Sequence, residues 1–258
     1  MINNRAEYEK MHAVEAHHWW YVNLHRLTLE ALTSDVQLPF DAAILDAGCG
    51  TGGMILALQT AGFTDVEGFD LSDDAVGFCQ QHGLKACKGD LRLIGTQYKG
   101  RLFDVVISHD NLYFLSPAEQ QRYFAEVALL LKPGGRLIMN APINPVFAGT
   151  HDLAVGIRER LSPEQLISLS VGAGLRIKRC WVWPFVLSSV IWLVRLTQRI
   201  KMRWGASQQL PESDVSLPPP WVNRALLMVC RLDARMFKRP WWGSSCFLVA
   251  EKAAHLDF

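Results

Sequence analysis

Three carboxylates and a glycine-rich turn are the residues whose types and spacing best suit chemistry. Asp46 lies near the end of an apolar segment that leads into the G-x-G-x-x-G run of residues 48–53, and Asp70 and Asp90 close the next two apolar segments. Glycines in such a turn let the backbone approach a ligand closely, and free N–H groups there are hydrogen-bond donors. The pattern predicts a site for a nucleotide-like cofactor.

The three carboxylates narrow the choice of cofactor. The glycine spacing also fits a nicotinamide or flavin site, but Asp46 stands two residues before the first glycine, where a carboxylate is awkward beside a pyrophosphate. It suits the ammonium group of an amino-acid ligand, directly or through a water. Asp70 is placed to accept both hydroxyls of a ribose. Asp90 offers an acceptor for an exocyclic amine, and Leu91 can pack on an adenine face.

The elements that must position these residues alternate between short apolar segments and helix-like patterns. This alternation predicts an α/β, Rossmann-like, doubly wound sheet with crossover helices. Polar residues then gather at the carboxyl ends of the parallel strands, where ligands of open α/β sheets bind. The expected strands are residues 43–47, 66–70, 85–89, 103–108, 136–141, 175–183 and 245–252.

Helix starts are marked by serine caps. Ser72 precedes two acids, and Ser116 and Ser162 are each followed by proline and then by Glu or Gln three residues after the serine, which is the capping-box pattern. We expect a helix from residue 117 to about residue 131, followed by a turn over residues 132–135.

The pattern breaks down after residue 183 for roughly sixty residues, far beyond an ordinary connection. This insertion holds the apolar aromatic run of residues 181–194, followed by basic residues, and a helix-like segment near residues 221–237. The predicted organisation is an N-terminal helical lid (1–40), a cofactor-binding core (41–183), a helical insertion (184–244) and the last strand of the core (245–258).

From about residue 42 to residue 142 the sequence resembles the class I S-adenosylmethionine-dependent methyltransferases, of the type that includes the quinone-biosynthesis methyltransferases. The resemblance rests on residues 46–52, Asp70, residues 89–90 and residues 131–135. It implies S-adenosyl-L-methionine as cofactor and S-adenosyl-L-homocysteine as product. It also implies a seven-stranded, mostly parallel sheet with an antiparallel final strand.

The resemblance assigns parts of the cofactor to particular residues. The glycine turn is expected to hold the methionine part, Asp70 the ribose, and Asp90 with Leu91 the adenine. The full set of implied cofactor-binding residues is Asp46, Gly48, Cys49, Gly50, Gly52, Asp70, Leu71, Asp90, Leu91, His109, Trp20 and Tyr21.

A narrower resemblance lies outside that core. Residues 15–21 (EAHHWWY) are similar to the H-W-W-[YF] start of a bacterial subgroup of type 11/12-like methyltransferases often associated with glycan or lipid modification. Leu24 and His25 stand where that subgroup usually has arginines, and residues 157–161 also depart from its pattern. We therefore expect an acceptor different from the subgroup's usual one.

Candidate catalytic residues follow the fourth and fifth strands. They are His109, Asp110, Tyr113 and His151, each of which could instead cap a strand end or contact the cofactor. Methyl transfer from a sulfonium is an in-line displacement in which positioning and desolvation can suffice, so a dedicated base is not required. The aromatic residues 17–20 form either a lid over the pocket or an ordinary helix packing face.

Composition excludes several classes. Half of the residues are hydrophobic, 20% are charged, and the net charge is +1, which argues against disorder and against nucleic acid as a partner. The six cysteines form no C-x-x-C pair, so no metal site is expected. Residues 1–10 lack the apolar core of a signal peptide, and residues 181–194 are shorter than the ~20 needed to span a bilayer. We expect a cytoplasmic protein.

These observations predict a methyltransferase that acts on a lipophilic or lipid-linked small-molecule or glycan acceptor, with oxygen as the methylated atom. Two alternatives stay open: an NAD(P)-dependent oxidoreductase that uses the same glycines, and a catalytically silent scaffold that retains the cofactor fold. Residues 181–204 have three explanations, namely a peripheral contact with the inner face of the membrane, an apolar roof over the acceptor, and a homodimer interface.

Overall fold

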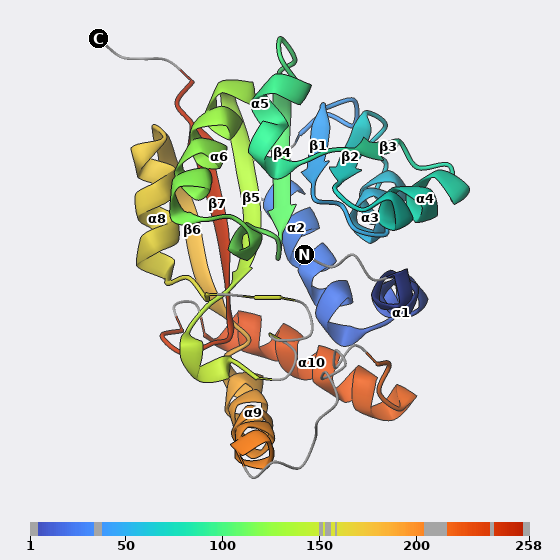
Figure 1. Cartoon of the computed structure of the whole chain (residues 1–258), viewed down its shortest axis with the longest axis vertical. Coiled ribbons are helices and arrows are strands. Elements are labelled where there is room, and N and C mark those ends of the chain that lie inside the picture. The colour runs from blue at the N-terminus through green and yellow to red at the C-terminus, as the bar shows by residue number, and fades with distance from the viewer. Residues whose placement is uncertain are drawn as a thin grey trace.

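Seven strands form one sheet in the order β3-β2-β1-β4-β5-β7-β6 in the computed structural model of the chain (Figure 1). The structure describes residues 5–33, 38–149, 152, 156–157, 159–203, 216–237 and 240–254. Strands β1 to β5 pair in parallel, and β7 is antiparallel to both of its neighbours. The predicted Rossmann-like sheet with an antiparallel last strand is confirmed. The strands are β1 (Ile44–Ala47), β2 (Val66–Asp70), β3 (Ala86–Lys88), β4 (Phe103–His109), β5 (Leu131–Pro142), β6 (Leu175–Trp183) and β7 (Ser245–Lys252).

Helices cover both faces of the sheet (Figure 1). One apolar core lies between the sheet and α5, α6 and α8, and the other between the sheet and α2, α3 and α4. Burial of these two apolar faces against helices is what holds a parallel sheet together. The α-helices are α1 (Arg5–Glu15), α2 (Trp19–Thr33), α3 (Gly53–Thr60), α4 (Asp73–Gln81), α5 (Ile94–Gln97), α6 (Pro117–Leu130), α8 (Pro163–Gly172), α9 (Phe185–Arg203) and α10 (Pro220–Met236).

The three predicted serine caps are present. The Ser72 side chain accepts a hydrogen bond from the backbone of Ala75 at 3.4 Å. Ser116 and Ser162 each form a complete capping box, in which the serine and the residue three positions later satisfy each other's backbone N–H groups. These caps fix where α4, α6 and α8 begin, and with them the lengths of the connections from the strand ends.

Strand β5 begins five residues earlier than the expected start at residue 136. Leu131 pairs with Phe103 and Arg136 with Val105, so the four intervening residues bulge out between two paired positions. The predicted Lys-Pro-Gly-Gly turn therefore exists, but the chain enters the sheet before it rather than after it.

Strand β6 ends at residue 183 as expected, and the described part of the segment after it contains two helices. Trp181 and Trp183 belong to β6 and are 6% and 1% exposed, so they are part of the core. Pro184 ends the strand, and α9 then projects away from the sheet while α10 crosses beneath it (Figure 1). Among the described residues, no helix is both long and apolar enough to cross a bilayer.

Candidate functional site

The glycine turn connects β1 to α3. Gly48, Gly50 and Gly52 have positive φ angles of 80°, 53° and 89°, which only glycine adopts without strain. A Cβ at Gly48 would collide with the side chain of Asn111. Asn111 donates to the Ala47 carbonyl at 2.5 Å and accepts from Ser108 Oγ at 2.7 Å. This buried amide, which the sequence patterns did not single out, braces the turn from β4.

Asp46 lies beneath the turn with a carboxyl oxygen that has no partner. The residue is 2% exposed, and its Oδ2 makes no hydrogen bond within the described part of the chain. Burial, with smaller contributions from Glu15 and Asp70, raises the pKa of Asp46 to about 8. A buried carboxyl in this condition is a natural acceptor for a cationic donor such as an ammonium group.

A second buried carboxyl comes from helix α1, which lies across the turn. Glu15 accepts from Thr51 Oγ1 at 2.5 Å, and a Cβ on Gly53 would collide with its carboxyl group. Burial raises the pKa of Glu15 to about 7, and the hydrogen bonds from Thr51 and the Gly53 backbone oppose this rise. Sequence patterns missed Glu15 as a site residue, although it opens the conspicuous segment of residues 15–21.

Asp70 stands at the end of β2, beside the turn as predicted. Its carboxylate accepts from the backbone N–H groups of Gly50 at 3.0 Å and Ser72 at 2.9 Å. The Tyr8 hydroxyl of α1 lies 3.4 Å from Asp70 Oδ1. The Leu71 backbone also donates to this carboxylate, while burial raises the pKa of Asp70. Asp70 thus presents a fixed, partly exposed acceptor where a ribose could reach it.

Two further predicted residues sit at the end of β3. Asp90 caps the short helical turn Leu91–Leu93, and Arg92 reaches both of its carboxylate oxygens at 2.9 and 3.0 Å through Nε. These hydrogen bonds hold the pKa of Asp90 below its usual value. Leu91 is half-buried and packs on the core. Cys49 is buried and a Cβ on Gly68 would strike it, so only its backbone can face a ligand.

Asp110, directly after β4, is a buried carboxyl in a hydrogen-bond network with Asn140, Trp20 and Trp183. Asp110 has a positive φ of 52°, accepts from Asn140 Nδ2 at 2.8 Å and receives a hydrogen bond from Trp20. Asn140 in turn accepts from Trp183 Nε1 at 2.9 Å. The Trp20 and Trp183 rings stack with centroids 4.5 Å apart. Burial raises the pKa of Asp110 to about 7, close to what proton transfer at neutral pH needs.

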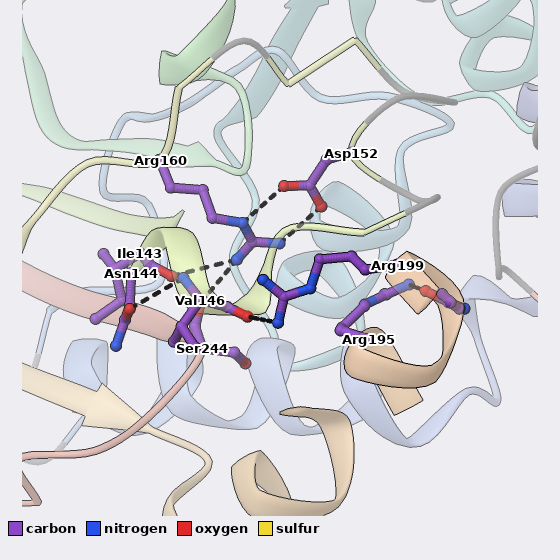
Figure 2. A network of polar contacts seen from close by, with 9 residues as sticks. Ile143, Asn144, Val146, Asp152, Arg160, Arg195, Arg199 and Ser244 are labelled. Carbon is purple, nitrogen blue, oxygen red and sulfur yellow. Dashed lines mark hydrogen bonds and ion pairs between the residues drawn. The ribbon is translucent and has the colours of Figure 1, made fainter. Parts of the chain in front are cut away.

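Two tyrosines surround Asp110. Burial raises the pKa of both Tyr21 and Tyr113, and the Asp110 charge contributes to each rise. Near Tyr113, Arg160 forms a two-pronged ion pair with Asp152, with Nε–Oδ2 and Nη2–Oδ1 distances of 2.7 and 2.8 Å. Arg160 also donates to the carbonyls of residues 143 and 244. Figure 2 shows this pair bridging the segment after β5 to the segment before β7. The site therefore has an aromatic half whose walls come from α2, β4 and the segment after β5.

His109 points toward α2. Its Nε2 lies 2.9 Å from Thr28 Oγ1, and its ring lies 6.3 Å from that of Phe247. Burial, with a smaller contribution from His25, lowers the pKa of His109 to about 3, so the imidazole is neutral. His151, also predicted to be catalytic, lies outside the described residues. The structure thus brings Asp110 and Tyr113 together with Trp20 and Tyr21 of α2, while the His109 ring contacts Thr28 farther along the same helix.

Comparison with known proteins finds matches to the part of the chain that contains the glycine turn. Residues 44–135 match the family described as "Methyltransferase domain". The chain is 30% identical over 124 residues to phosphoethanolamine N-methyltransferase 3 of Arabidopsis thaliana, covering 45% of this chain and 24% of that protein. It is 32% identical over 114 residues to carboxy-S-adenosyl-L-methionine synthase of Colwellia psychrerythraea, covering 40% and 46%. The chain thus spans less than half the length of either relative.

A solved structure shares the fold over most of the chain. It is that of Haemonchus contortus phosphoethanolamine N-methyltransferase 2 in complex with S-adenosyl-L-methionine, with a TM-score of 0.57 and 16% identity, covering 90% of this chain and 52% of that one. The strand order, the glycine turn and these matches agree: the chain contains a class I methyltransferase domain, of the S-adenosylmethionine-dependent type. The oxidoreductase alternative finds no support in them.

Proposed function

We propose that this protein transfers the methyl group of S-adenosylmethionine to an oxygen atom of a lipophilic or lipid-linked acceptor. The observation that carries the proposal is the pair of buried carboxyls beside the glycine turn, Asp46 and Glu15, neither of which forms an ion pair within the described residues. The cofactor carries an ammonium group and a sulfonium, so it supplies the positive charge that two buried carboxyls require.

The residues present fit this cofactor. The unpartnered Asp46 Oδ2 and the carboxyl of Glu15 would hold the ammonium group, Asp70 the ribose hydroxyls, and Leu91 the adenine face. When bound, the cofactor supplies an electrophilic methyl group. The turn requires glycine at Gly48 and Gly53, because side chains there would collide with Asn111 and Glu15.

Asp110 is the residue we assign to proton transfer. An alcohol or phenol acceptor must lose its proton as the oxygen becomes the nucleophile, and a carboxyl with a pKa of about 7 is half ionised near neutral pH. Asn140 and Trp20 fix the orientation of the carboxylate, while the neutral His109 faces away toward Thr28. Tyr21 and Tyr113 would then exclude water from the reacting oxygen.

The aromatic half of the site supports a lipophilic acceptor. Phe147 and Trp242 pack with centroids 4.8 Å apart near the Arg160 pair, and Trp20 stacks on Trp183. Beyond them, α9 leaves the apolar residues Val186, Val190, Leu193, Val194 and Ile200 between 46% and 55% exposed. We place the membrane-facing or acceptor-covering role predicted for residues 181–204 on this exposed part of α9, since Trp181 and Trp183 are buried.

The test measures cofactor binding and turnover separately. Calorimetric titration with S-adenosylhomocysteine should show binding at micromolar concentration, and incubation with labelled S-adenosylmethionine and a panel of long-chain alcohols, phenols and amines should label a phenol or alcohol. Asp110→Asn should abolish turnover and preserve binding. Asp41→Asn, an exposed carboxylate remote from the site, is the matched control. Labelling of amines alone would contradict the oxygen assignment, and tight binding without any turnover would favour a scaffold.

A further inference from the structure

A second hollow lies away from the cofactor turn, between α2, β6 and α10. It has a volume of about 320 Å³ and is lined by Arg26 and Glu30 of α2, Arg179 and Trp181 of β6, and Arg231 and Arg235 of α10. None of the residues of the glycine turn or the Asp110 network lines it. The methyl-transfer chemistry proposed above leaves this hollow without a role.

The hollow carries an excess of positive charge. Glu30 pairs with Arg26 on the same helix, whereas Arg179, Arg231 and Arg235 form no ion pair within the part of the chain that the structure describes. Guanidinium groups that converge on one hollow repel each other unless an anion lies between them. Their planar forks match the oxygens of phosphate, which they bind in pairs of hydrogen bonds.

The floor of the hollow adds buried donors without partners. Trp181 is 6% exposed, yet its Nε1–H has no acceptor among the described residues, and Arg26 Nε is likewise buried without a partner there. The Arg179 guanidinium lies 5.4 Å from the centroid of the Trp181 ring, which holds it over the floor. Buried N–H donors normally have partners, so these two atoms indicate an acceptor group that enters the hollow.

Helix α10, which lines the hollow, also carries an exposed apolar stripe. Trp221, Met228, Leu232 and Met236 recur at helical spacing along α10 and are 75%, 59%, 45% and 71% exposed. Arg231 and Arg235 each precede one member of this apolar stripe by one residue, so the arginines border it on one side. An exposed apolar stripe bordered by arginines is the arrangement of a helix that lies in a membrane interface, and α10 lies at the outside of the molecule, below the sheet (Figure 1).

We propose that the arginine hollow binds the phosphate of an anionic membrane phospholipid while the apolar stripe of α10 rests at the acyl boundary. The proposal rests on the proposed function only in that a lipophilic acceptor would be found at a membrane, and it concerns a separate site. It can be measured without turnover.

The experiment uses the full chain and sedimentation with vesicles of phosphatidylcholine, with and without phosphatidic acid. Binding should require phosphatidic acid, and soluble glycerol 3-phosphate should compete. The double variant Arg231→Gln/Arg235→Gln should weaken vesicle binding by about tenfold or more, at about 1 kcal/mol for each basic residue near an anionic surface. The charge-matched control is Lys99→Gln/Arg122→Gln, which removes exposed charges elsewhere and should change binding by less than about twofold on the same scale.

A second variant tests the floor directly. Trp181→Phe removes the Nε1–H donor and keeps an aromatic ring, and it should weaken binding to phosphatidic acid vesicles while the thermal midpoint stays close to that of the parent. Equal losses of vesicle binding in both double variants would mean that only net charge matters and would overturn the assignment of the phosphate to the arginine hollow. Tight binding of glycerol 3-phosphate with no vesicle binding would overturn the lipid source. Loss of S-adenosylhomocysteine binding or turnover with vesicle binding intact would contradict the proposed function and leave this site standing.

Discussion

Lowering the pH from about 8 to about 6 should weaken binding of S-adenosylhomocysteine, because the ammonium group of the ligand needs ionised carboxyls. Asp46 has a pKa of about 8 and Glu15 a pKa of about 7 in the ligand-free protein. Both values are raised by burial, so the folded protein holds these protons more tightly than the unfolded chain. The ligand must displace them, and binding should release protons.

The size of the effect follows from the ionised fraction. With a pKa of about 8, Asp46 is half ionised at about pH 8 and about one per cent ionised at about pH 6, which predicts a loss of about 50-fold, or about 2 kcal/mol. If Glu15 must also be ionised, its pKa of about 7 adds a further factor of about tenfold over the same range.

The free energy of unfolding depends on pH in the opposite direction to cofactor affinity. A carboxyl whose pKa is raised in the folded state contributes its full stability below its unfolded pKa of about 4, and this contribution is lost as the pH rises through the folded pKa. The ligand-free protein should therefore become less stable between about pH 4 and about pH 8, where the ligand gains affinity. Chemical denaturation with and without ligand separates the two trends.

Calorimetry in two buffers with different heats of ionisation provides the assay. The difference between the observed enthalpies gives the number of protons released, which should approach one at about pH 7 and fall for Asp46→Asn. The same variant should flatten the pH dependence of the dissociation constant. A dissociation constant that is constant over this pH range, together with equal enthalpies in the two buffers, would refute the assignment of the ammonium group to these carboxyls.

Three further predictions concern the same elements. Asp70→Ala should weaken S-adenosylhomocysteine binding by on the order of 2 kcal/mol through lost charge-assisted hydrogen bonds; an unchanged calorimetric dissociation constant would contradict the ribose assignment. Gly48→Ala should lower cofactor affinity more than tenfold, with a stability loss of about 1–3 kcal/mol from the left-handed backbone and the clash with Asn111, measured by urea denaturation. Ser116→Ala should cost about 1 kcal/mol of stability by removing a capping box, with cofactor affinity unchanged.

Local signals allowed the sequence to predict the cofactor half of the site. The glycine turn, Asp46 and Asp70 lie next to strand ends that apolar runs mark, and parallel strands bring their ends to one edge whatever the rest of the chain does. The capping boxes likewise depend on residues a few positions apart. Such features need no knowledge of distant packing.

Features that depend on long-range packing were not predictable. Glu15 and Tyr8 reach the site only because α1 crosses the turn, and no periodicity in α1 specifies where it docks. His109 is the last residue of β4, one residue beyond the expected strand, and whether its ring faces the ligand or Thr28 depends on how α2 packs. For the aromatic run of residues 181–194, the sequence predicted the strand that ends at residue 183, but it did not show which face of the following helix α9 is exposed.

The position of α1 also has a kinetic consequence. The Tyr8 hydroxyl lies 3.4 Å from Asp70 Oδ1, and Glu15 accepts a hydrogen bond from Thr51, so we expect cofactor entry and exit to require that α1 moves away from the turn. Exchange of spent cofactor for fresh cofactor is then limited by a conformational opening rather than by diffusion. Association rates should level off at high ligand concentration, at a value set by how often the N-terminal helix detaches. Changes in α1 at positions other than Glu15 should alter turnover through this opening step.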